Sequence, residues 1–122
     1  MKTNLLFLTL SVLFISFSCK KLKIEKELRI DIGTQFQNDV VTIKLDDDVV
    51  FSGSVSTNTV LGVSEILTFN YPIGQYHISV IVNGVEKTSK FKHKKNRFIY
   101  ISYEKQTSDI TISFPNEKYI YD

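Results

Sequence analysis

The densest charged cluster in this sequence is basic and lies between positions 87 and 97. Six cations occupy these eleven positions with no acid among them: Lys87, Lys90, Lys92, Lys94, Lys95 and Arg97. Cations at this density attract phosphate and carboxylate groups, so the cluster favours anionic lipid head groups, lipopolysaccharide phosphates or an acidic protein partner. The alternative interpretation is a solvated strand edge whose lysines prevent aggregation between edges.

A second group, Asp46, Asp47 and Asp48, has the oxygen ligands that Ca²⁺ prefers. Three consecutive side chains point in alternating directions, however, so they cannot all reach one ion unless another loop, such as one with Asn58 or Asp109, completes the site. The spacing also differs from the D-x-D-x-D-G calcium loop. An exposed turn that keeps a sheet edge soluble is the alternative that the pattern favours.

Tyrosines near the C-terminus offer a third kind of chemistry. Tyr119 and Tyr121 lie close together, and Phe98, Tyr100 and Tyr103 alternate along a stretch upstream. Exposed tyrosine rings beside polar loops provide a platform for sugar rings or for a protein partner. We expect Phe98 and Tyr100 to fill the core instead, on the face opposite to Tyr103, while Tyr119 and Tyr121 stay candidate binding residues.

The residues that catalysis needs do not converge in the sequence. Alternation around His77 predicts an outward or half-buried strand position, and the lysines beside His93, the other histidine, predict a solvated turn. No G-x-S-x-G elbow, zinc spacing, P-loop or dinucleotide fingerprint occurs. We therefore expect a protein that is not an enzyme and that holds no cofactor.

The N-terminal residues have the layout of a secretion signal. Lys2 gives a basic start, an almost uncharged apolar run extends from Leu5 to Phe17, and the single cysteine, Cys19, follows. The run is shorter than the roughly 20 residues that a spanning helix needs. A lone cysteine cannot form an internal disulfide, and an exposed thiol is a liability in an oxidising compartment, so a modified Cys19 is expected. The alternative is cleavage near Ser18 that leaves a free or partner-linked thiol.

This layout resembles the signal peptide of bacterial lipoproteins. The resemblance covers residues 1 to 19 and ends on Ser16-Phe17-Ser18-Cys19, where the usual pattern has Leu three residues before the cysteine and small residues at the next two positions. Phe17 departs from that pattern because it is bulky. The resemblance implies a signal peptide at 1–18, a covalent lipid on Cys19, a short tether at 19–22 and a single domain at 23–122.

The same resemblance implies a location. An Asp directly after the lipidated cysteine favours the inner membrane, whereas this chain has Lys20 there. The acidic stretch that some bacteria use for surface export is also absent, because residues 20–24 contain no acid. The resemblance therefore implies attachment to the outer membrane, with the domain facing the periplasm.

Length and charge limit the classes of function for the mature chain. Removing 18 of the 122 residues leaves 104, enough for one domain with one core. Of the 15 basic residues only Lys2 is lost, so 14 cations face 13 acids and the side-chain balance is +1. A nearly neutral domain of this kind argues against a dedicated nucleic-acid-binding protein.

Apolar and polar residues alternate along the whole mature chain, with no helical periodicity. Asn83-Gly84 is the preferred pair for a type I′ turn, so it predicts a β-hairpin over 75–92. We expect a loop at 56–64 that crosses between sheets, and 119–121 is a candidate edge strand. The remaining strands are expected at 22–32, 41–45, 49–55, 65–70, 97–103 and 109–114.

Seven to eight short strands with tight turns predict an all-β fold, a small antiparallel β-sandwich. The sequence has no Trp and no cysteine pair, which excludes an antibody-type core. An Ig-like or fibronectin-like topology, a transthyretin-like one and a small barrel stay open.

Two functions fit these observations. The first is a lipid-anchored, non-catalytic module of the cell envelope that binds a protein, as an accessory subunit, inhibitor or immunity-like factor. The second is an envelope domain that binds a glycan or polyanion through the lysines or the tyrosines. The first is preferred because the sequence shows no groove signature.

Overall fold

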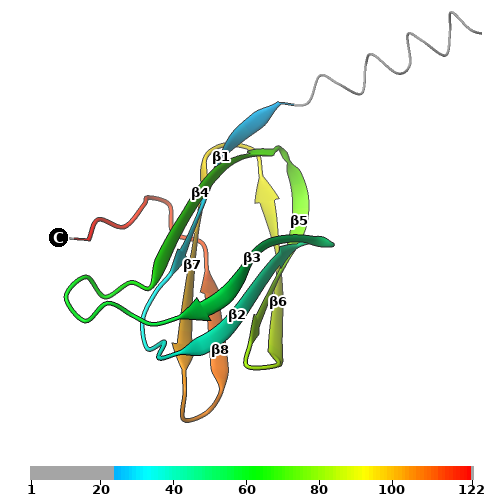
Figure 1. The fold of residues 1–122 in the computed structure, drawn as a ribbon. Coiled ribbons are helices and arrows are strands. Elements are labelled where there is room, and N and C mark those ends of the chain that lie inside the picture. Colours follow the sequence, from blue (N-terminus) through cyan, green and yellow to red (C-terminus); the bar gives the residue numbers. More distant parts are fainter. Residues whose placement is uncertain (1–23, 122) are drawn as a thin grey trace, which may run out of the picture.

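The computed structural model describes residues 24–121, and within them eight strands form two four-stranded sheets that pack face to face (Figure 1). The predicted all-β sandwich is therefore confirmed. The predicted signal peptide, Cys19 and the predicted tether lie outside the described residues. The strands are β1 (Glu25–Ile32), β2 (Asp39–Leu45), β3 (Asp48–Val55), β4 (Glu65–Pro72), β5 (Gly74–Val82), β6 (Val85–His93), β7 (Arg97–Glu104) and β8 (Asp109–Ser113).

The two sheets exchange strands along the chain. Sheet A has the order β4-β1-β7-β8 and sheet B the order β3-β2-β5-β6. Neighbours pair antiparallel, except that β1 and β7 pair parallel, with Leu28 opposite Arg97. A parallel pair needs a long crossover connection, and here strands β2 to β6 provide it. The loop at 56–64 crosses from sheet B to sheet A, as predicted.

The core lies between the sheets and follows the period-two pattern. Residues that alternate along the four central strands are fully buried or nearly so, because successive side chains of a strand point to opposite faces. The innermost of them are Leu28, Ile30 and Ile32 on β1, Val41, Ile43 and Leu45 on β2, Ile78, Val80 and Val82 on β5, and Ile99 and Ile101 on β7.

The predicted Asn-Gly hairpin is confirmed. Asn83 and Gly84 have φ values of 50° and 86°, the positive angles that a type I′ turn requires. The amide of Asn83 donates to Asp39 Oδ1 at 2.8 Å, and its Oδ1 accepts from the N–H of Val40 at 3.0 Å. The turn is thus tied to the start of β2 as well as joining β5 to β6.

Two predictions about the aromatic residues are wrong. Phe98 and Tyr100 lie half-buried on the outer face of sheet A, because β7 turns Ile99, Ile101 and Tyr103 into the core. The residues 119–121 form no strand; they cross the outer face of sheet A, where the Tyr119 ring meets the Tyr100 ring at a centroid distance of 4.9 Å. The C-terminal segment is therefore a cover for one sheet face.

Candidate functional site

The structure gathers most of the basic cluster at one end of the sandwich. On β6, Lys90 and Lys92 stand opposite His77 and Gln75 of β5, on the outer face of sheet B. Lys87 pairs with Val80, on the other face and further along the strand. The gathered set, here called the cationic end, is Lys90, Lys92, Lys94, Lys95 and Arg97.

A groove of about 800 Å³ runs along this end. Its lining combines three cations with one carboxylate, an amide, an imidazole and aromatic rings, so its charge is positive on balance and it suits an anionic ligand more than an apolar one. The lining residues are Asp46, Gln75, Tyr76, His77, Lys90, Phe91, Lys92 and Arg97.

Arg97 is the part of the groove with unused hydrogen-bonding capacity. Its guanidinium carbon lies 5.2 Å from the centre of the Phe114 ring, a cation–π contact that holds the side chain in place. Its Nε is buried and has no hydrogen-bond partner among residues 24–121. The buried Nε is out of reach of a ligand, so Arg97 contributes its positive charge to the groove, which attracts phosphate or carboxylate groups.

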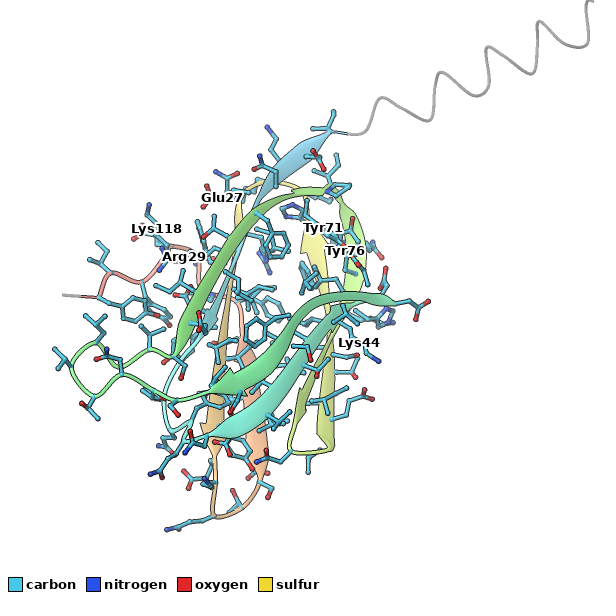
Figure 2. All side chains as sticks on the ribbon, viewed as in Figure 1. Glu27, Arg29, Lys44, Tyr71, Tyr76 and Lys118 are labelled. Atoms are coloured by element: carbon cyan, nitrogen blue, oxygen red, sulfur yellow. The ribbon has the colours of Figure 1, made fainter. Side chains whose placement is uncertain are left out.

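Aromatic rings form a continuous row across this end, from sheet A to sheet B and back. Neighbouring ring centroids are 5.2 to 5.9 Å apart, the spacing of favourable edge and offset contacts. Figure 2 shows Tyr71 and Tyr76 side by side where β4 leads into β5. The row runs through Phe69, Tyr71, Tyr76, Phe91 and Phe114, and Arg97 rests on its last ring.

His93 is a buried structural residue, which corrects the prediction of a solvated turn. Its side chain is fully buried at the end of β6. The Nε2 atom lies 3.1 Å from the carbonyl oxygen of Lys26 and 3.0 Å from that of Tyr71, so Nε2 carries the proton and donates to both. This contact joins sheet B to β1 and β4 of sheet A.

The turn between β6 and β7 lies against the first residues of β1. Asn96 Oδ1 accepts from the N–H of Glu27 at 3.2 Å, and the carbonyl oxygen of Ile24 accepts from the N–H of Ile73 at 2.9 Å. The cationic end is therefore the end of the sandwich at which the described chain begins, as Figure 1 shows at the top of β1.

The aspartate group forms a hairpin turn with bonds of its own. Asp46 has a φ of 53°, and its Oδ1 accepts from the backbone N–H of His77 at 2.9 Å. The His77 side chain is exposed beside it, which agrees with the predicted outward position. Asp48 accepts from the Tyr71 hydroxyl at 2.9 Å. Burial, followed by this hydrogen bond, raises the pKa of Tyr71 to about 12.

No second loop completes a calcium site at this turn. Asn58 lies in the crossing loop, where its Oδ1 accepts from the N–H groups of Val60 and Leu61, and Asp109 pairs with Glu104 at the start of β8. Among residues 24–121, no three His, Cys, Asp or Glu side chains come close enough together to hold a metal ion.

The two C-terminal tyrosines are held by a charged pair that sequence reasoning missed. Arg29 Nε donates to Asp31 Oδ1 at 2.7 Å, and another guanidinium nitrogen donates to the carbonyl oxygen of Tyr119 at 3.1 Å. The Tyr121 hydroxyl donates to Asp31 Oδ2 at 2.7 Å. Burial and this bond raise the pKa of Tyr121 well above its usual range. Arg29 and Asp31 alternate like solvated residues, so nothing local indicated that a distant segment covers them.

The same cover creates an exposed apolar patch, defined as Val60, Leu61, Ile66, Tyr119 and Ile120. Each of these side chains is more than 40% exposed, and Val60 and Ile120 reach 83% and 80%. Four of them, all except Val60, line a shallow hollow of about 350 Å³ whose lining also includes Arg29, Lys118 and Tyr121. Figure 2 shows Arg29 and Lys118 where the C-terminal segment passes β1.

The patch and the cationic end lie toward opposite ends of β1. Ile66 pairs with Asp31, whereas Tyr71 pairs with Lys26, so five residues of strand, or about 16 Å, separate the two levels. The centres of the two regions are therefore apart, although Ile120 and Lys118 also line a hollow of about 470 Å³ with Glu27 and Asn96, next to the cationic end.

Comparisons with known proteins add little to this geometry. No family model matches the sequence, and no curated protein matches it. A similar solved structure is described as "NMR structure of the protein from Eubacterium rectale"; it is 18% identical, with a TM-score of 0.47, and the match covers 77% of this chain and 91% of that chain. Within residues 24–121 there is no helix long and apolar enough to cross a bilayer.

Proposed function

We propose that this protein is a lipid-anchored, non-catalytic interaction module of the bacterial cell envelope. The anchor is the lipid on Cys19, in the outer membrane, and the domain faces the periplasm. The module presents the apolar patch to a protein partner. The signal-like residues 1–19 support the anchor, and the patch supports the partner.

The observation that carries the proposal is the patch itself. Three segments far apart in the sequence, the crossing loop, β4 and the C-terminal residues, bring four large exposed apolar side chains around one hollow: Leu61, Ile66, Tyr119 and Ile120. Contiguous exposed apolar surface on a soluble domain marks interaction sites, whereas scattered single residues do not. Arginine and tyrosine, which line the hollow here, are the residue types that contribute most to protein interfaces.

The lining also indicates the chemistry of the partner. The ion pairs within residues 24–121 involve Arg29, His77 and Lys105, so Lys118 at the rim of the hollow has no carboxylate partner there. A complementary protein segment places an apolar side chain in the hollow and a carboxylate beside Lys118.

Cross-linking in cells tests this proposal. The tagged protein is cross-linked, and captured proteins are identified by mass spectrometry for the wild type and for the double variant Leu61→Glu, Ile120→Glu. Val85→Glu is the matched control, because Val85 is 43% exposed, like Leu61 at 42%, but lies at the β5–β6 turn. We expect one abundant partner that the double variant loses and the control keeps. A partner that all three proteins capture equally would contradict the proposed site.

A second candidate function is capture of a glycan or polyanion. The groove at the cationic end favours it, because Lys90, Lys92 and Arg97 line one cavity. Such binding weakens steeply with salt, whereas binding to the apolar patch does not, so the salt dependence of ligand binding separates the two functions.

A further inference from the structure

We infer that the cationic end is a membrane-docking surface that rests on the anionic phosphates of the bilayer to which the protein is anchored. This inference rests on the proposed lipid anchor at Cys19. It adds an orientation that the anchor alone does not give: the β6–β7 turn faces the lipid, and the apolar patch, on the outer face of sheet A, stays at the side of the molecule.

The covalent chain sets the first condition. Five residues lead from Cys19 to Ile24, and a fully extended chain spans at most about 3.6 Å per residue, so Ile24 lies within about 18 Å of the lipid attachment. Ile24 is hydrogen-bonded at the cationic end, to the N–H of Ile73. Whatever the path of the tether, this end of the sandwich is held near the bilayer surface.

Charge sets the second condition. Lys92, Lys94 and Lys95 are exposed at this end, and Lys26 of β1 is exposed beside them. In the sequence, three further lysines lie between Cys19 and Ile24, namely Lys20, Lys21 and Lys23. Clusters of this size next to a membrane attachment bind anionic head groups, and a lipid chain plus a polybasic segment is a stable combination of membrane signals.

The acids at this end are outnumbered by the cations. Glu25 and Glu27 lie on β1 beside the turn, and the acidic turn of Asp46 to Asp48 is also close, because Asp46 lines the groove with Lys90, Lys92 and Arg97. These five acids face nine cations, namely the five of the cationic end, Lys26 and the three lysines that follow Cys19 in the sequence. The net charge at this end is therefore +4.

Lysine labelling on vesicles tests the orientation. The mature lipidated protein is reconstituted on vesicles of phosphatidylcholine alone and on vesicles that also contain phosphatidylglycerol, and amine acetylation rates are read by mass spectrometry. On the anionic vesicles we expect Lys94 and Lys95 to react about fivefold more slowly, since each lysine near such a surface gains a favourable interaction of that order. Lys105 follows the last residue of β7, at the opposite end, and serves as the internal control whose rate does not change.

Salt and a charge-reversal variant sharpen the test. The protection disappears in about 1 M salt, where the Debye length falls to about 3 Å. The double variant Lys94→Glu, Lys95→Glu abolishes the slower labelling of Lys92 on anionic vesicles, whereas the control Lys105→Glu keeps it. Thermal melts of both variants check that the fold is intact.

The outcomes separate this inference from the proposed function. Lipidated protein with equal labelling on both vesicle types would overturn the docking surface and leave the anchor and the apolar patch standing. A mature protein whose intact mass carries no lipid would overturn the anchor and the inference with it. Protection of Lys94 and Lys95 by soluble polyphosphate, with none on anionic vesicles, would overturn membrane docking in favour of a soluble polyanion.

Discussion

The cationic end and the apolar patch differ in how the chain builds them. The five cations of the cationic end come from one continuous stretch, residues 90 to 97: two from β6, two from the turn after it, and Arg97 from the start of β7. The patch comes from the crossing loop, β4 and the C-terminal residues, which only the fold brings together. One surface is local and charged, and the other is nonlocal and apolar. The difference predicts that a mutation that loosens the C-terminal segment disturbs the patch and leaves the cationic end unchanged.

The largest effect is expected where the two sheets are joined at the cationic end. His93→Ala removes a fully buried ring and leaves the carbonyl groups of Lys26 and Tyr71 without their donor. A cavity together with unsatisfied buried acceptors destabilises by about 3–4 kcal/mol. Urea unfolding monitored by circular dichroism measures this loss. A change below about 1 kcal/mol would mean that His93 does not join the sheets.

A smaller effect, confined to the patch, is expected from Asp31→Ala. The substitution leaves Arg29 without its partner and frees the Tyr121 hydroxyl, so the C-terminal cover loosens. Loss of one partner of a largely buried pair costs about 2–3 kcal/mol here. Hydrogen exchange should rise across residues 116–121 and stay unchanged in the β6–β7 turn. Equal increases in both regions would show that the two surfaces are coupled.

Alkaline pH tests both regions, because each contains a tyrosine whose pKa is raised on folding. Folding raises the pKa of Tyr71 to about 12 and also raises that of Tyr121. A raised folded-state pKa gives stability that is complete below the ordinary value of about 10 and is lost as the pH climbs through the folded value, on the order of 1–2 kcal/mol for such half-exposed groups. Urea midpoints measured from about pH 9 to about pH 12 should fall less steeply in Tyr71→Phe and Tyr121→Phe than in the wild type. Identical slopes in all three proteins would contradict this account.

The smallest effect on stability is expected at the lysines of the turn. Lys94→Ala and Lys95→Ala change exposed side chains that form no ion pair within residues 24–121, so the free energy of unfolding should stay within about 0.5 kcal/mol of the wild type. The same variants should weaken protection on anionic vesicles. A large loss of stability would show that these lysines are structural rather than available for contact with lipid.

The strands were predictable because their signal is local. Alternation placed β1 to β8 within a few residues, and Asn83-Gly84 marked its turn, since positive φ at two successive positions restricts the residue types. Alternation also accounts for the faces of the lysines on β6. In the observed register, Lys90 and Lys92 lie on one face of the sheet and Lys87 lies on the other.

The errors came from residues whose environment is set at long range. His93 has lysines on its C-terminal side, yet carbonyl groups from β1 and β4 surround its ring. Tyr100 was expected in the core, but it lies half-buried on the outer face of sheet A, where the C-terminal segment covers it. Its ring lies against Gly33, and a larger residue in place of Gly33 would collide with that ring. Neither contact has a counterpart within a few positions of sequence. The apolar patch was missed for the same reason.

Site-specific photo-cross-linking in cells tests the central claim most directly. A photoreactive phenylalanine analogue replaces Leu61 in the patch or Lys94 at the cationic end, both of which are exposed positions. The account predicts that the probe at Leu61 captures a single protein and that the probe at Lys94 captures lipid and no protein above background. Capture of that same protein through Lys94, with none through Leu61, would contradict it.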